Sequence, residues 1–177
     1  MKKKWSHHQP NLLTTTNMVM GVVAIFLLLE TSEARRMACA LVLVGALADA
    51  CDGSIARLLG AESVLGKQLD SFADSTTFGL APAAILYSFP ALKGQSTLLP
   101  LLVLYAMAGF FRLARYNLGD FSNHFQGLPI TAAGFIVAIF ALLLDIFYGH
   151  VTPAQVRLLT AVLLVGLSLA MVSRVKI

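Results

Sequence analysis

The chain has 177 residues, of which 58% are hydrophobic and only 12% charged, and its mean hydropathy is +0.79. Soluble globular domains carry about 25% charged residues, so this composition excludes an ordinary soluble domain and indicates an integral membrane protein. The formal net charge of +4 is small, and nucleic-acid binding is not expected.

Six apolar segments follow one another along the chain, and each is long enough for the roughly 20 residues of a membrane-spanning helix. They cover residues 12–29, 37–59, 68–90, 97–117, 128–148 and 154–173. Turn-forming residues separate them at 30–36, 60–66, 90–96, 119–127 and 148–153. Because backbone in lipid must satisfy its own hydrogen bonds, we expect an all-α, six-transmembrane-helix bundle. It forms one membrane domain over residues 1–177, with residues 1–10 as a juxtamembrane segment.

Basic residues predict the orientation of this bundle. With six spans both termini lie on one side, together with nine basic residues: Lys2, Lys3, Lys4, Arg57, Lys67, Arg112, Arg115, Arg174 and Lys176. Four others lie on the opposite side, namely Arg35, Arg36, Lys93 and Arg157. Because loops on the cytoplasmic side are enriched in Lys and Arg, we expect a multi-pass protein of the cytoplasmic membrane with both termini cytoplasmic.

The first segment carries polar residues inside an apolar helix. Thr14 and Asn17 are three residues apart and therefore share one helix face. Small polar side chains of this kind form hydrogen bonds between membrane helices, which is one interpretation of the pair.

Four aspartates lie in the second and third segments, within the stretch DACDGSIARLLGAESVLGKQLDSFAD at residues 49–74. A charged side chain at the centre of a spanning helix costs about 2.5–3.5 kcal/mol on insertion scales, so the cluster has a function unless the side chains reach the cytoplasmic edge. Spacings of three for Asp49 and Asp52, and of four for Asp70 and Asp74, place each pair on one helix face.

A turn between a C-cap at Gly60 and an N-cap at Ser63 puts both pairs at matching depths, about 10 Å and about 15 Å from the turn. Antiparallel packing then brings four carboxylates together. Hard oxygen ligands without His or Cys indicate Mg²⁺, Mn²⁺ or Ca²⁺. Four carboxylates are enough for two ions about 3.5–4 Å apart, an arrangement suited to displacement at phosphorus.

Small residues flank the aspartates. Gly53, Ala56 and Gly66 leave room for a ligand near the backbone, and Arg57 offers a fork for phosphate oxygens. Close helix–helix packing is the alternative explanation of the small residues.

The fourth segment ends with two arginines on one face, Arg112 and Arg115, three residues apart. They could clamp an anion, either a carboxylate or a phosphate group. Anchoring at the cytoplasmic surface is the alternative. Asn117 and Gln126 could add hydrogen bonds to the same ligand or serve the loop structure. Asp145, near the outer end of the fifth segment, is expected at the outer membrane interface.

The pattern D-x2-D-G-x2-A-R-x8-G-x3-D-x3-D, complete from Asp49 to Asp74, resembles the signature of the CDP-alcohol phosphatidyltransferases. Members of this family are six-helix membrane enzymes, usually homodimers, that use the hydroxyl of an alcohol to displace CMP from a CDP-activated lipid. The stretches PNLLTTTN, FGLAPA, FRLARYN and QGLPITAAG look like its phosphatidylserine synthase branch. The resemblance thus implies CDP-diacylglycerol and L-serine as substrates, with glycerol 3-phosphate or inositol phosphate as alternative acceptors.

The same resemblance implies a role for each site residue. The metal ligands for two Mg²⁺ or Mn²⁺ ions are Asp49, Asp52, Asp70 and Asp74, and Asp74 is also the general base that takes the proton of the alcohol. The CDP-lipid contacts are Thr14, Asn17, Gly53, Ala56, Arg57 and Gly66. The acceptor contacts are Arg112, Arg115, Asn117 and Gln126. A cation transporter is the less favoured class, because the chain lacks the inverted repeats and paired broken helices of transporters.

Overall fold

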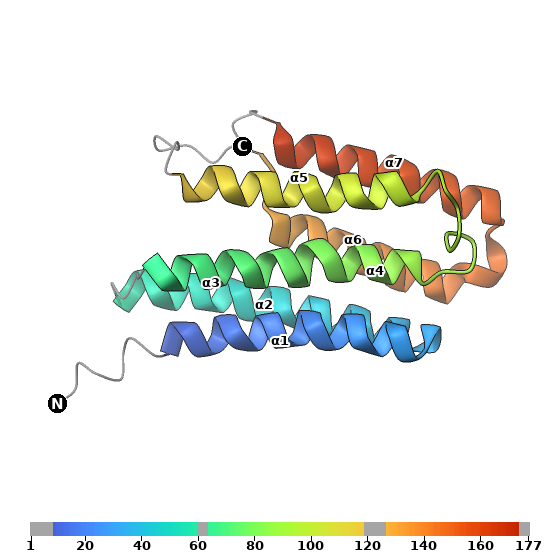
Figure 1. The fold of residues 1–177 in the computed structure, drawn as a ribbon. Helices are drawn as coiled ribbons and strands as arrows, with labels where there is room; N and C mark the ends of the chain where they lie inside the picture. The colour runs from blue at the N-terminus through green and yellow to red at the C-terminus, as the bar shows by residue number, and fades with distance from the viewer. Residues whose placement is uncertain (1–8, 60–63, 119–126, 174–177) are drawn as a thin grey trace.

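The computed structural model describes residues 9–59, 64–118 and 127–173, with the side chains of these ranges except 9–13, 32, 51–59 and 64. These residues form helices and turns, with no strand among them. The helices are α1 (Gln9–Glu30), η1 (Ser32–Ala34), α2 (Arg35–Leu59), α3 (Val64–Asp74), η2 (Ser75–Leu80), α4 (Ala81–Tyr87), α5 (Leu99–Asn117), α6 (Ile130–Phe147), η3 (Tyr148–His150) and α7 (Pro153–Val172). Figure 1 shows the long helices running side by side in one bundle.

Each predicted apolar segment corresponds to a helical stretch, the third being α3, η2 and α4 in succession. Within the described ranges, three stretches are long and apolar enough to cross a membrane, namely Leu99–Asn117, Ile130–His150 and Pro153–Val172. The shorter apolar stretch Thr14–Glu30 belongs to α1. The all-helical fold is therefore confirmed, whereas six spans stay a prediction. One reason is that the third segment is divided into the short helices α3, η2 and α4, of which α3 has 11 residues.

One helix boundary differs from expectation and another agrees with it. α1 begins at Gln9, so the helix includes the last two residues of the expected juxtamembrane segment. α3 begins at Val64, directly after the position expected for the N-cap, although the apolar segment is counted only from residue 68. The expected caps at Gly60 and Ser63 lie outside the described residues.

The packing places η2 at the centre of the bundle. α1 packs along α2, α2 also packs along α6, and α5 packs along α7. η2 contacts α1, α5 and α6. Its residues Thr77, Phe78 and Gly79 are buried, and many Leu, Val and Phe side chains on the outer faces of the helices are exposed, as expected for helices that face lipid.

η2 is a single turn of π-helix that directly follows Asp74. Turns of this kind occur frequently at functional sites. The hydroxyl of Ser75 donates to the carbonyl oxygen of Ser71, four residues earlier, at 2.6 Å, and such bonds bend helices. The hydroxyl of Tyr105 on α5 donates to the carbonyl oxygen of Phe78 at 2.8 Å. Side chains thus support the irregular backbone beside Asp74 from within and from a neighbouring helix.

Glycines allow two helices to approach η2 closely. A Cβ atom on Gly21 of α1 would lie 2.5 Å from Oγ1 and 2.7 Å from Cα of Thr77. A Cβ atom on Gly134 of α6 would lie 2.7 Å from Cβ of Phe78. Carbon atoms normally pack about 3.5–4.0 Å apart, so a larger residue at either position would push η2 away.

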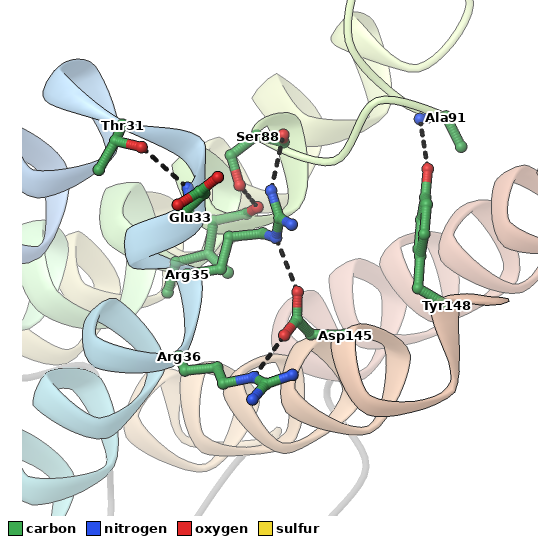
Figure 2. Close-up of polar contacts among 9 residues, drawn as sticks. Thr31, Glu33, Arg35, Arg36, Ser88, Ala91, Asp145 and Tyr148 are labelled. Atoms are coloured by element: carbon green, nitrogen blue, oxygen red, sulfur yellow. Dashed lines mark hydrogen bonds and ion pairs between the residues drawn. The ribbon is translucent and has the colours of Figure 1, made fainter.

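At the end of the bundle where α2 begins and α6 ends, polar side chains connect these two helices (Figure 2). Nε of Arg35 donates to Oδ1 of Asp145 at 2.9 Å, and Nε of Arg36 donates to Oδ2 at 2.6 Å. The Asp145 side chain is only 12% exposed. The sequence predicted an interfacial position for Asp145 but not these two partners.

Candidate active site

Three of the four aspartates come together between α2 and α3. Asp49 is on α2, and Asp70 and Asp74 lie one turn apart on α3. One carboxylate oxygen of each lies within 4.8 Å of the other two. Asp74 is buried, at 8% exposure, whereas Asp49 and Asp70 are more accessible. The structure thus produces the convergence that the residue spacing predicts.

The triad of Asp49, Asp70 and Asp74 fits a divalent cation with hard oxygen ligands. Mg²⁺ lies about 2.1 Å from its oxygen ligands and Ca²⁺ about 2.4 Å, so oxygens on opposite sides of one ion lie about 4–5 Å apart. The oxygens of the triad meet this spacing. Oδ1 of Asp74 is buried without a hydrogen-bond partner among the described residues, as expected for an atom that awaits a ligand.

Thr131 contributes to the triad from a third helix. It lies in the first turn of α6, and its hydroxyl donates to Oδ2 of Asp49 at 3.0 Å. Residues that hold a ligating carboxylate in this way orient it toward the metal. Sequence reasoning missed Thr131, although it lies in the stretch QGLPITAAG. The missing information was the pairing of α6 with α2.

Arg112 lies on the inner side of α5, near Asp74. The two opposite charges are close enough to attract one another, and Nε of Arg112 is buried without a hydrogen-bond partner among the described residues. Arg115 differs, because its Nη1 donates to the carbonyl oxygen of Val172 on α7 at 3.3 Å. Of the two arginines, Arg112 is thus the one beside the acidic triad.

Asn117 links the end of α5 to α3. Its Nδ2 donates to Oγ of Ser71, the neighbour of Asp70, at 2.8 Å. Its Oδ1 is buried without a partner in the part of the chain that the structure describes. The structure therefore places Asn117 at the edge of the triad, where a ligand could donate a hydrogen bond to its Oδ1.

The two polar residues of α1 are both buried, Thr14 at 7% and Asn17 at 1% exposure. Oδ1 of Asn17 lies 2.7 Å from the position that a Cβ atom on Gly45 of α2 would take. Neither side-chain polar atom of Asn17 has a hydrogen-bond partner among the described residues. Asn17 thus presents an unsatisfied amide to α2 at Gly45, which lies one helical turn from Asp49.

The remaining predicted site residues are only partly placed. Gly66 is on α3 and partly buried. Asp52, Gly53, Ala56 and Arg57 belong to α2, but their side chains lie outside the described part of the chain. Gln126 lies outside the described residues altogether.

Comparison with known proteins gives a consistent result. The family model of CDP-alcohol phosphatidyltransferases matches residues 7–172. The chain is 33% identical over 170 residues to the CDP-diacylglycerol–serine O-phosphatidyltransferase of Helicobacter pylori, a match that covers 94% of this chain and 70% of that protein. It is 33% identical over 168 residues to the Bacillus subtilis protein of the same name, a match that covers 94% of this chain and 88% of that protein. It is also 35% identical over 162 residues to the archaetidylserine synthase of Methanothermobacter thermautotrophicus, a match that covers 89% of this chain and 66% of that protein.

Proposed function

Because the chain belongs to the CDP-alcohol phosphatidyltransferase family, we propose that it transfers the phosphatidyl group of CDP-diacylglycerol to the hydroxyl of L-serine and releases CMP. The observation that carries serine as the acceptor is that the three relatives described above are all named for serine transfer or for an archaetidylserine product. The juxtaposition of Asp49, Asp70 and Asp74 supports the chemistry.

In the proposed reaction the serine hydroxyl oxygen bonds to the phosphorus that carries the diacylglycerol. The phosphoanhydride bond to CMP breaks, and CMP leaves with the bridging oxygen. The hydroxyl proton passes to the carboxylate of Asp74. A carboxylate is a weak base for an alcohol, so catalysis depends on holding the hydroxyl in hydrogen-bond reach of Asp74.

The metal ligands in this proposal are Asp49, Asp52, Asp70 and Asp74, with Mg²⁺ or Mn²⁺ as the ions. A divalent cation held by these carboxylates would neutralise the pyrophosphate and the negative charge that develops on departing CMP. Thr131 holds Asp49 in place for this role.

In this proposal the substrate contacts are assigned to polar and small residues around the triad. Arg112 binds the serine carboxylate beside Asp74, and Oδ1 of Asn117 accepts a hydrogen bond from the serine ammonium group, with Arg115 and Gln126 as further contacts. Thr14 and Asn17 bind the nucleotide from α1. Gly53, Ala56, Arg57 and Gly66 line the CDP pocket. The buried, unsatisfied atoms of Asn17, Asp74 and Arg112 support these assignments, because a ligand would satisfy them.

The membrane arrangement in the proposal is one domain over residues 1–177 with six spans, a homodimer, and cytoplasmic termini. The aspartates then face the cytoplasm, where the water-soluble substrate serine is available. The excess of Lys and Arg on that side supports the orientation.

An ether-linked archaeal donor is the second candidate, favoured by the 35% identity to an archaetidylserine synthase. Both candidates use the same acceptor and the same aspartates. They differ in the lipid chains and in their linkage to glycerol, which lie away from the reacting phosphorus.

The test is CMP release by the purified full-length chain with Mn²⁺ or Mg²⁺. CDP-diacylglycerol and CDP-archaeol are each supplied with L-serine, glycerol 3-phosphate, inositol phosphate or no acceptor, and lipid products are identified by mass. We expect CMP release that requires serine. Release only with a phosphorylated acceptor contradicts serine and assigns Arg112 to phosphate binding, and no release with any pair contradicts the proposed transfer.

A further inference from the structure

A second polar site lies at the end of the bundle opposite the aspartates. Five residues line a pocket of about 370 Å³: Glu33, Arg35, Arg36, Asp145 and Tyr148. Arg36 and Asp49 are thirteen residues apart on α2, so the pocket lies about 20 Å along the helix from the triad. The chain reverses here between α1 and α2 and between α6 and α7 (Figure 1). In a membrane-spanning bundle, the turns between helices lie at the membrane interface, where the lipid phosphates are.

One arginine of this pocket is fully engaged. Arg35 donates to Asp145 and donates again from Nη1 to the carbonyl oxygen of Ser88 at 3.5 Å (Figure 2). Its Cζ atom also lies 4.8 Å from the centre of the Phe89 ring. Its side chain is only 18% exposed. Arg35 therefore holds α2, α4 and α6 together and has little capacity left for a ligand.

The other arginine retains free donors. Arg36 is 69% exposed and uses Nε for Asp145, which leaves its two Nη groups without a partner among the described residues. The hydroxyl oxygen of Tyr148 accepts from the backbone N–H of Ala91 at 3.0 Å, so its own hydrogen remains to donate. A guanidinium fork beside a hydroxyl suits the oxygens of a phosphate.

The charges of the pocket also select the ligand. Two arginines face two carboxylates, Asp145 and Glu33, so the formal charges sum to zero. Asp145 is occupied by both arginines, whereas the carboxylate of the exposed Glu33 has no partner in the described part of the chain. A neutral pocket with separated positive and negative groups complements a zwitterion better than an anion, because Glu33 repels a ligand that lacks a cation.

We propose that this pocket binds a phosphate group that carries a nearby ammonium group, with the phosphate on Arg36 and Tyr148 and the ammonium on Glu33. The headgroup of phosphatidylethanolamine has this chemistry and lies at this level of the bilayer. Free phosphoethanolamine has the same chemistry without the lipid. The site is separate from the transfer reaction, since all five residues lie at the opposite end of the bundle.

The test measures ligand-dependent thermal stabilisation of the full-length chain in neutral detergent. The probes are phosphatidylethanolamine, phosphatidylglycerol and phosphatidylcholine with identical acyl chains, and water-soluble phosphoethanolamine. The variants are Arg36→Gln, Glu33→Gln and, as a matched control at the same end of the bundle, Arg157→Gln, which does not line the pocket. Serine-dependent CMP release shows that each variant is folded.

We expect phosphatidylethanolamine to stabilise the wild-type chain more than the other two lipids. Arg36→Gln should weaken its binding roughly tenfold or more, since a hydrogen bond to a charged group is lost, and Arg157→Gln should keep it. Glu33→Gln should abolish the preference over phosphatidylglycerol. A shift with phosphoethanolamine alone assigns the site to the free molecule. Equal shifts for all lipids, or an unchanged shift in Arg36→Gln, overturns the proposal.

Discussion

The hydroxyl of Thr131 donates a 3.0 Å hydrogen bond to Oδ2 of Asp49 and so connects the first turn of α6 to the acidic triad. Because this hydrogen bond fixes Oδ2, it also fixes the direction in which Oδ1 of Asp49 points. Thr131 acts through Asp49 and is therefore a positioning residue.

Replacing Thr131 with valine should weaken Mn²⁺ binding about 10–100-fold, the usual effect of removing an outer hydrogen bond to a metal ligand. Thr131→Ser keeps the hydroxyl and should retain most of the affinity. Binding is measured without substrates, from the free Mn²⁺ signal in electron paramagnetic resonance as protein is added.

The matched control for this experiment is Thr160→Val. Thr160 is also buried, but it is on α7 and its hydroxyl has no hydrogen-bond partner among the described residues. This variant should bind Mn²⁺ like the wild-type chain. Equal affinity of wild type and Thr131→Val would show that the hydrogen bond does not serve the metal.

Asp74→Asn should lower serine-dependent CMP release about 100-fold or more, because an amide cannot take the proton of the hydroxyl. Asp70→Asn is the comparison, since Asp70 belongs to the same triad but has no role as the base. It should weaken Mn²⁺ binding, and added Mn²⁺ should restore part of its activity. If Asp74→Asn retains most of the activity, the proton goes to another group.

Arg112→Gln should raise the KM for serine roughly tenfold or more, because a charged partner of the serine carboxylate is lost. Arg115→Gln is the matched control, since Arg115 is also on α5 but donates to Val172 on α7. Its KM should change less. Steady-state CMP release at varied serine concentration checks both, and an equal rise in the two variants would contradict the distinction between the arginines.

Much of the candidate site could be predicted from local spacing. Asp49, Asp70 and Asp74 are expected to converge because intervals of three or four residues place side chains on one helix face, and because carboxylates within a membrane bundle need a cation. The roles of Thr131 and of Asp145 could not be found in this way. Each depends on which helix lies beside another, and both partners lie more than eighty residues away in the chain.

The π-helical turn η2 also escaped prediction, for a related reason. Its sequence, STTFGL, is compatible with an ordinary helix in an apolar segment. The turn is held by contacts from other helices, including the hydroxyl of Tyr105 on the carbonyl oxygen of Phe78. Gly134 on α6 also packs closely against Phe78 of this turn. Such tertiary contacts routinely override local propensity.

Gly134→Ala should therefore destabilise the bundle. The added Cβ would lie 2.7 Å from Cβ and 2.9 Å from Cα of Phe78, so backbone must move. Overpacking of this kind costs about 1–3 kcal/mol, which corresponds to a fall of about 2–12 °C in Tm for a chain of this size. Gly166→Ala on α7 is the control, because no heavy atom of the described residues, apart from the adjoining backbone of α7 itself, lies within 4 Å of its added Cβ. Alanine favours a helix, so this variant should keep or raise the Tm.

The same substitution should affect catalysis, because η2 directly follows Asp74 and a shift of Phe78 moves the backbone that carries this carboxylate. CMP release is compared at a temperature where both glycine variants remain folded. We expect Gly134→Ala to lose activity and Gly166→Ala to keep it. Lower stability with unchanged activity in Gly134→Ala would show that η2 supports the fold without positioning Asp74.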